Sequence, residues 1–341
     1  LISTFNKHDC YKFSIIQPNR TLFLKLINIG KFPIPIPNLR SFNNLVKKAD
    51  IIHLTNFWTL LNLYAYIFCV INNKKYVICP AGALKIMGDS KLFKLFYKIL
   101  FGDFIINNAS SLIAITDREK REFEKYGVPS KKISVIPNGI ECAEKNFSDK
   151  NIEDEFKKFR PYILFIGRLN YIKGPDLLLK AFIKIAKDFP EYKLLFAGPD
   201  EGMKINLDSM IKKSKLENKV LFLGFVNELR KRSLYQNASI LVIPSRSEAM
   251  SLVVLEAALN GLSSIFTNVC GLESLAKNKN FYSVEVDEYK IAEALREFLC
   301  NKQKNKYYKN KKIREYVRKN FNWDLIAKKY IDILYCHCNL H

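Results

Sequence analysis

Short apolar segments alternate with longer amphipathic segments along two stretches of this chain. In the first stretch, strands are predicted near residues 51–53, 76–79, 112–115 and 133–136, and helices over 59–71, 91–106 and 118–126. In the second stretch, strands are predicted near 162–166, 193–197, 220–223, 239–243 and 264–266, again separated by helical segments. Such alternation is typical of parallel sheets with helices on both faces. We therefore expect an α/β protein.

Two glutamates follow the predicted strand that ends at Pro244. Glu248 lies in a short polar loop, and Glu256 lies about one turn inside the apolar helical segment 252–259. A carboxylate among apolar neighbours is costly unless a partner hydrogen-bonds to it. The unpaired amides at the start of that helix suit a phosphate, so amides and two carboxylates together suit a sugar nucleotide. The alternative is that Glu256 faces solvent or pairs with a nearby lysine.

Two cations follow the apolar strand 162–166. Arg168 comes almost directly after the strand, and Lys173 stands just before Pro175, which suits the first turn of a helix. Ligands of open α/β sheets bind beyond the carboxyl ends of strands, where two cations and helix amides would hold a diphosphate. The alternative is a solvated loop in a basic protein. We favour the phosphate site because both cations fall in one strand-to-helix turn.

The order of these motifs resembles one family. Gly167-Arg168-Leu169, then three residues and Lys173-Gly174, followed by Glu248-Ala-Met, five residues and Glu256, is similar to the paired signature of the retaining glycosyltransferases called group 1 or family 4. The likeness covers most of residues 50–335. It implies the GT-B architecture, in which two Rossmann-like domains with parallel sheets face each other across a cleft. It also implies transfer without a metal or another cofactor.

The resemblance implies a role for each matched residue. Arg168 and Lys173 would bind the diphosphate of a nucleotide-sugar donor and stabilise the leaving phosphate electrostatically, as catalytic residues together with Glu248. Glu248 would hold hydroxyls of the donor sugar, and Glu256 those of the ribose. The other donor-binding positions would be Gly167, the base-contacting Phe225 and Val226, and the backbone of Met250, Ser251 and Leu252. No enzyme nucleophile is implied.

The acceptor side departs from the family. Many relatives read Ser-Pro-His-Gly where this chain reads Cys-Pro-Ala81-Gly82, and a frequent His-x-His motif keeps only His53. We take Ala81, Gly82 and Asn138 as acceptor-side candidates and interpret His53 as a strand-end core residue. The family's first strand and glycine-rich loop are not recognisable in residues 1–17. Either an upstream segment is missing or this edge is shortened.

A chain of 341 residues is expected to form two domains. We place an N-terminal, acceptor-side domain at 1–145, a polar linker at 146–160 and a C-terminal, nucleotide-sugar-binding domain at 161–320. The segment 321–341 is similar to the family's closing segment, and we expect its helix to pack back toward the first domain.

The chain is strongly basic, with a formal net charge of +22, which indicates an acidic partner or surface. Lys91, Lys94 and Lys98 recur at helical spacing among large apolar residues, the pattern of a helix in a membrane interface. In the resembled family this helix can dock on anionic lipid. The alternative is an ordinary domain helix with solvated lysines. We expect no nucleic-acid partner, because no nucleic-acid-binding module is recognisable.

Together these features predict a retaining transferase that moves a sugar from a nucleoside diphosphate sugar to a glycolipid or polysaccharide precursor of the cell envelope, such as lipopolysaccharide. We expect it in the cytoplasm, peripheral to the membrane, because the eight cysteines have no disulfide or zinc spacing and the apolar stretch 57–71 is too short to span a bilayer. The alternative, motivated by Ala81, is a catalytically impaired relative that binds donor or membrane.

Overall fold

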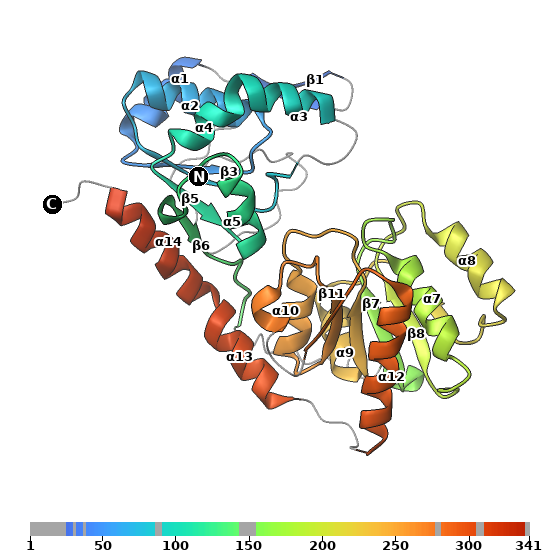
Figure 1. Cartoon of the computed structure of the whole chain (residues 1–341). Coiled ribbons are helices and arrows are strands. Elements are labelled where there is room, and N and C mark those ends of the chain that lie inside the picture. Colours follow the sequence, from blue (N-terminus) through green and yellow to red (C-terminus); the bar gives the residue numbers. More distant parts are fainter. Residues whose placement is uncertain are drawn as a thin grey trace. The chain divides into compact units, whose positions relative to one another are not determined.

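Figure 1 shows the computed structural model of the chain, which describes residues 25–29, 32–36, 39–85, 91–142, 155–276, 281–304 and 310–337. The chain divides into two compact units. Unit 1 comprises residues 1–136 and 327–341, and unit 2 comprises 137–326. Residues 1–17, where the family's first strand is not recognisable, and residues 146–154 of the predicted linker lie outside the described ranges. The domain boundaries expected from the sequence stay predictions.

Unit 1 contains a four-stranded parallel sheet in the order β3-β4-β5-β6. Its strands are β3 (Ile52–Thr55), β4 (Tyr76–Cys79), β5 (Ser111–Ala114) and β6 (Ile133–Val135), which confirms the four predicted positions. All residues of β4 and β5 are buried, as in a sheet covered by helices on both faces. An antiparallel pair, β1 (Lys25–Ile29) and β2 (Phe32–Ile36), was not predicted.

Two helices of unit 1 begin with a side-chain cap. Thr59 accepts a hydrogen bond from the amide of Asn62 at the start of α2, and Thr116 accepts one from the amide of Glu119 at the start of α5. The predicted helix near 91–106 is confirmed, and a π-helical turn with wider hydrogen-bonded rings lies within it. The helical elements are α1 (Leu39–Lys48), α2 (Leu60–Ile71), α3 (Lys91–Tyr97), the π-helical η1 (Lys98–Gly102), α4 (Asp103–Asn107), α5 (Asp117–Glu124) and the short η2 (Ser130–Lys132).

Unit 2 contains a six-stranded parallel sheet in the order β12-β11-β10-β7-β8-β9. The five predicted strands are confirmed, and β12 is additional: β7 (Tyr162–Ile166), β8 (Lys193–Ala197), β9 (Val220–Phe222), β10 (Ile240–Ile243), β11 (Ser264–Thr267) and β12 (Phe281–Val284). Strand order reverses between β7 and β10, because β8 and β9 extend to one side and β11 and β12 to the other. The carboxyl ends of strands at such a switch point are where open α/β sheets bind ligands.

Apolar side chains from the sheet of unit 2 pack against its helices. The cluster includes Phe165 and Phe196 from neighbouring strands and Phe182 from α7, and all three are fully buried. Helices α7 and α12 lie side by side (Figure 1). The helical elements are η3 (Lys157–Phe159), α7 (Pro175–Ile185), α8 (Lys204–Lys213), α9 (Glu228–Asn237), α10 (Leu252–Leu259), α11 (Glu273–Ala276), α12 (Glu288–Lys304) and α13 (Lys311–Phe321).

Helix α14 (Trp323–His337) begins in unit 2 and belongs to unit 1 from Ala327 onward. In unit 1, its Tyr330 packs against the ring of His53, with 5.7 Å between ring centroids, and its hydroxyl lies 3.3 Å from the thiol of Cys79. These contacts tie the end of the chain to β3 and β4. Among the described helices, none combines the length and the apolar character needed to cross a bilayer.

Candidate functional site

The structure brings Lys173 and Glu248 into direct contact. Lys173 lies in the loop between β7 and α7, and Glu248 lies in the loop between β10 and α10, so both stand at the switch point of the sheet. The Lys173 Nζ donates a hydrogen bond to Glu248 Oε1 over 2.5 Å. Their side chains are 23% and 12% exposed, so the pair is largely but not fully shielded from water. A short charge-assisted hydrogen bond of this kind fixes both head groups.

Two glycines allow the loops around this pair to approach each other. Gly174 has φ 67°, and a Cβ there would lie 2.2 Å from the carbonyl oxygen of Pro244. Gly271 also has φ 67°, and its Cβ would lie 2.0 Å from the carbonyl oxygen of Ala249. Any side chain at either position would clash with backbone in a conformation that L-residues disfavour. The loops after β7, β10 and β11 therefore pack backbone to backbone.

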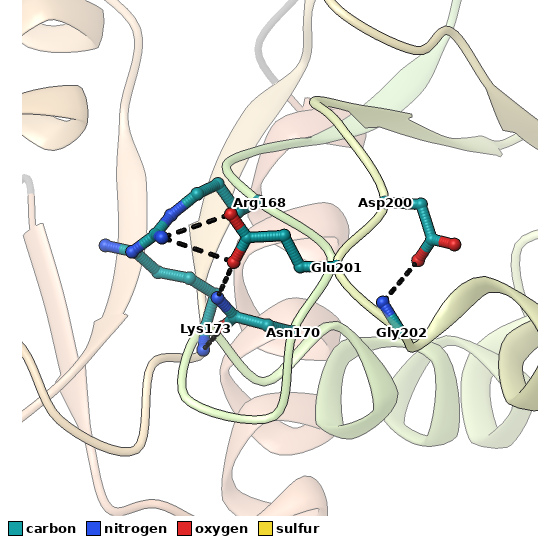
Figure 2. A network of polar contacts seen from close by, with 6 residues as sticks. All are labelled: Arg168, Asn170, Lys173, Asp200, Glu201 and Gly202. Atoms are coloured by element: carbon teal, nitrogen blue, oxygen red, sulfur yellow. Dashed lines mark hydrogen bonds and ion pairs between the residues drawn. The ribbon is translucent and has the colours of Figure 1, made fainter. Parts of the chain in front are cut away.

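Arg168 takes part in a network with the loop after β8. Its Nη1 donates to both carboxylate oxygens of Glu201, over 3.1 and 3.2 Å, and Asn170 Nδ2 donates to Glu201 Oε2 over 2.7 Å (Figure 2). The Asn170 Oδ1 in turn accepts from the backbone amide of Lys173. Hydrogen bonds from Asn170 and Arg168 lower the pKa of Glu201. Since more than half of the Arg168 side chain is exposed, its remaining donors face solvent.

The position of Glu201 depends on its neighbour Asp200. The Asp200 Oδ1 accepts hydrogen bonds from the backbone amides of Gly202, Met203 and Lys204, each over 3.0 Å. These three bonds lower the pKa of Asp200, and the bond from the amide of Lys204 lowers it most. They also cap the start of α8. Neither Asp200 nor Glu201 is among the site residues predicted from the sequence. Glu201 follows the carboxyl end of β8, as Arg168 follows that of the neighbouring β7. This shared position was the signal in the sequence that the two side chains could meet.

Glu256 lies on α10 and is already paired. Its Oε2 accepts from the hydroxyl of Tyr235 and from the Nζ of Lys231, each over 2.9 Å. Burial lowers the pKa of Lys231, but its interactions with Glu256 and Glu228 outweigh burial and raise it. Pairing with a nearby lysine was the alternative interpretation of Glu256 in the sequence analysis, and the structure contains this pairing. Its ribose-binding role stays a prediction, and Tyr235 and Lys231 are partners that the sequence reasoning missed.

The start of α10 offers backbone amides beside the Lys173–Glu248 pair. Ser251 is the residue before the helix, yet its side chain does not cap it, and its buried hydroxyl makes no hydrogen bond to any described residue. Met250 is buried, and Leu252 is exposed. An uncapped helix start beside a cation can accept an anion. The amide of Ser251 itself donates to the carbonyl oxygen of Cys270 over 3.0 Å, and the donor-binding role of these three residues stays a prediction.

The remaining donor-side candidates lie at the same edge of the sheet. Phe225 and Val226 follow β9, and Phe225 is 76% exposed, so its ring is accessible for stacking. The amide of Gly198 donates to the carbonyl of Gly224 over 2.8 Å, which joins this loop to the loop after β8. Gly167 follows β7. A Cβ on Gly198 would lie 2.0 Å from the carbonyl oxygen of Gly167. A glycine is thus required at Gly198 for the loops to pack.

The acceptor-side candidates are not gathered in one unit. Ala81 and Gly82 form an exposed loop after β4 in unit 1, with φ of 52° and 88°, whereas Asn138 belongs to unit 2. The amide of Gly82 donates to Glu119 Oε1 over 2.6 Å, and the other oxygen of Glu119 accepts from the amide of Ile115 over 2.8 Å. Burial raises the pKa of Glu119. This buried carboxylate was missed by the sequence reasoning.

No group of three or more His, Cys, Asp or Glu side chains is placed to hold a metal ion in the ranges that the structure describes. Metal-independent chemistry stays a prediction, because it rests on the resemblance and not on this observation.

Comparisons with known proteins match both halves of the chain to families of known type. The family described as glycosyl transferases group 1 matches residues 147–319, and the family described as glycosyltransferase family 4 matches residues 16–144. An uncharacterised glycosyltransferase of Methanocaldococcus jannaschii is 32% identical over 229 residues, covering 61% of this chain and 55% of the relative. The gpi3 subunit of phosphatidylinositol N-acetylglucosaminyltransferase from Schizosaccharomyces pombe is 29% identical, covering 58% and 42%. The chain thus spans about half the length of these curated relatives.

Solved structures support the fold. The crystal structure of Anabaena HepE in complex with UDP and glucose has a TM-score of 0.72 and 18% identity, and the match covers 87% of this chain and 81% of that one. At this identity the likeness concerns the fold alone, and it is the two-domain GT-B fold with a parallel sheet in each domain.

Proposed function

Because this chain belongs to the glycosyl transferases group 1, we propose that it transfers a hexose from a nucleoside diphosphate sugar to a glycolipid or polysaccharide precursor. Transfer proceeds with retention of configuration and without a metal. The enzyme works at the inner face of the cell membrane. Anabaena HepE is solved with UDP and glucose, which supports a UDP-sugar as the first donor to test.

The observation that carries the proposal is the pair Lys173–Glu248 at the switch point of unit 2. An ammonium group has three donors, and only one is used by Glu248, so two remain for phosphate oxygens. Charge that builds up on the leaving diphosphate is stabilised by a cation held in place beforehand. Glu248, held by the same contact, lies next to where the donor sugar leaves.

Arg168 supplies a second cation on the neighbouring loop. In the chain without donor, Glu201 accepts from its Nη1, and this exposed ion pair is weak enough for a diphosphate to replace it. Arginine also matches two phosphate oxygens at once through its planar group. The donor diphosphate is thus bound between Arg168, Lys173 and the first amides of α10.

The acceptor is lipid-linked because unit 1 offers a surface for anionic lipid. Lys91 begins α3, and apolar side chains stand exposed on α3, η1 and α4: Leu92, Phe93, Leu95, Phe96, Ile99, Leu100 and Phe104. Soluble domains rarely expose so many neighbouring large apolar groups. Lys94 and Lys98 lie among them, and each lysine near an anionic membrane contributes about 1 kcal/mol.

Donor turnover tests the proposal. Purified protein is incubated with UDP-, GDP- and ADP-sugars and a lipid extract in the presence of EDTA, and release of nucleoside diphosphate and transfer to lipid are measured. We expect one donor to be used by the wild type and not by Lys173→Ala, while Lys187→Ala, which removes an exposed lysine of the same unit, stays active. Activity unchanged in Lys173→Ala contradicts the proposal.

A second candidate function, donor binding without transfer, is favoured by Ala81, which stands where many relatives have a histidine. Donor binding by the wild type without product under all these conditions supports it.

Vesicle binding tests the membrane surface separately. We expect co-sedimentation with phosphatidylserine-containing vesicles to be lost in Lys94→Glu/Lys98→Glu and in Leu92→Ser/Phe96→Ser. The matched control Lys47→Glu/Lys48→Glu changes the same charge at the exposed end of α1. Equal losses in the control and in the α3 variants contradict a defined docking surface.

A further inference from the structure

We infer that Arg246 and Asp176 form a clamp whose role is to position Lys173 for the donor diphosphate. Arg246 lies in the loop after β10, and Asp176 is the second residue of α7. Neither is assigned a role by the family signature given above. The inference rests on the proposed function, because it concerns how the same site is held in its working geometry.

The clamp is a planar ion pair with additional contacts. The Arg246 Nη1 donates to Asp176 Oδ1 over 2.8 Å, and its Nη2 donates to Asp176 Oδ2 over 2.6 Å. The same Nη1 donates to the carbonyl oxygen of Tyr171 over 2.7 Å, and the guanidinium carbon lies 4.0 Å from the centroid of the Tyr171 ring. The backbone amide of Arg246 donates to the carbonyl oxygen of Ile172 over 2.7 Å. One residue therefore makes four kinds of contact.

These contacts surround Lys173 in the sequence. Tyr171 and Ile172 immediately precede it, and Asp176 follows three residues later, so Arg246 binds the loop on both sides of the lysine. Because Lys173 is held at both sides, its side chain has few ways to leave Glu248. Arg246 itself is two residues before Glu248, so the clamp fixes the segment that carries each member of the pair.

The chemistry of the pair requires arginine. A lysine would keep the charge, but it cannot donate to two carboxylate oxygens in a plane while it also donates to a carbonyl and lies over an aromatic ring. The Arg246 and Asp176 side chains are 19% and 12% exposed, so solvent screens their interaction less than it screens a surface pair. Arg246→Lys is therefore the most informative variant, since it keeps the positive charge but removes the planar, two-point contact with Asp176.

A purely structural ion pair nearby provides a matched control. Arg296 on α12 donates through Nε to Asp188 Oδ2 over 3.2 Å and through Nη2 to the carbonyl oxygen of Lys184. Like Arg246, it binds one aspartate and one backbone carbonyl, but both partners lie at the far end of α7 from Lys173. Arg296→Lys thus repeats the chemical change away from the donor loop.

The experiment measures nucleoside diphosphate binding by titration calorimetry, with whichever of UDP, GDP and ADP the wild type binds most tightly. Arg246→Lys and Asp176→Asn are each expected to weaken binding about tenfold, while Arg296→Lys stays within about twofold of the wild type. In a Lys173→Ala background, Arg246→Lys is expected to cause no further loss, because the clamp acts through Lys173. Hydrogen exchange is expected to increase in residues 168–176 for Arg246→Lys and not for Arg296→Lys.

The outcomes separate the two proposals. The clamp is overturned if the wild type binds a nucleoside diphosphate and Arg246→Lys binds it equally well. It is also overturned if Arg246→Lys loses the same affinity with and without Lys173. Both outcomes leave the proposed function standing. A wild type that binds none of the three nucleoside diphosphates overturns the proposed function, and with it the purpose of the clamp. If Arg246→Lys weakens nucleoside diphosphate binding only when Lys173 is present, both the clamp and the proposed function are supported.

Discussion

The loops that follow the strands are held differently in the two units. In unit 2 they are joined by ion pairs between side chains, Lys173–Glu248 and Arg246–Asp176. In unit 1 the loop after β4 is joined to the end of β5 by one buried carboxylate, Glu119, that accepts from two backbone amides. The loops of unit 2 thus add contacts between their own charged side chains to their close backbone packing, whereas the loop after β4 contributes a backbone amide to its contact with Glu119.

This difference explains where the sequence keeps recognisable motifs. A loop held through its amides tolerates many side chains, so alanine at Ala81 is compatible with the fold of unit 1. A loop held through side-chain charges cannot change them without losing the contact, and the same charges suit a donor diphosphate. The motifs of unit 2 are therefore easier to recognise in the sequence than those of unit 1.

The largest expected effect comes from removing the central cation of unit 2. Lys173→Ala is expected to lower kcat by about 10²-fold, because charge on the leaving diphosphate loses its preorganised partner. Initial rates at saturating donor measure this change. A variant with wild-type kcat but a raised KM would show that Lys173 binds the donor without stabilising the transition state.

A similar test in unit 1 should affect stability instead of turnover. Glu119→Gln replaces one acceptor oxygen by an amide donor, and the amide left unpaired costs about 1–3 kcal/mol. Trp58 lies in unit 1 and Trp323 in unit 2, and the chain has two tryptophans, so urea unfolding in a Trp323→Phe background reports unit 1 through Trp58. Glu122→Gln on the same helix, in an exposed pair with Lys125, is the control. Equal losses in both variants would remove the special role of Glu119.

Unit 1 is also expected to be sensitive to acid through His53. Burial lowers the pKa of His53 to about 4 from an ordinary value of 6.5. The folded state therefore binds fewer protons between these values, so this contribution to stability is present above pH 6.5 and is lost as the pH falls toward 4. In the Trp323→Phe background, His53→Phe should flatten this part of the stability profile. A profile parallel to that with His53 present would contradict the shift.

The smallest effect is expected for the exposed pair of unit 2. Glu201→Gln removes a carboxylate that competes with the donor for Arg168, and exposed pairs contribute little because water screens them. Affinity for the nucleoside diphosphate should therefore rise by about two- to fivefold, more at low salt than at high salt. Weaker binding would mean that Glu201 orients Arg168 instead of competing for it.

Much of the fold could be predicted from local patterns. The nine predicted strands are present, because short apolar runs bounded by turn residues identify buried parallel strands. The hairpin β1–β2 and strand β12 lack so clear a pattern. The π-helical turn η1 depends on hydrogen-bond register, which periodicity does not reveal.

The sequence by itself determined which strand ends carry the candidate donor-site residues, since Arg168, Lys173, Glu248 and Glu256 follow recognisable strands at characteristic spacings. Only the tertiary structure decided which of these side chains meet. Lys173 and Glu248 are 75 residues apart and touch because β7 pairs with β10, whereas Glu256 is paired with Lys231 and Tyr235 instead. Strand order depends on the packing of the whole sheet, and a local pattern of residues does not contain it.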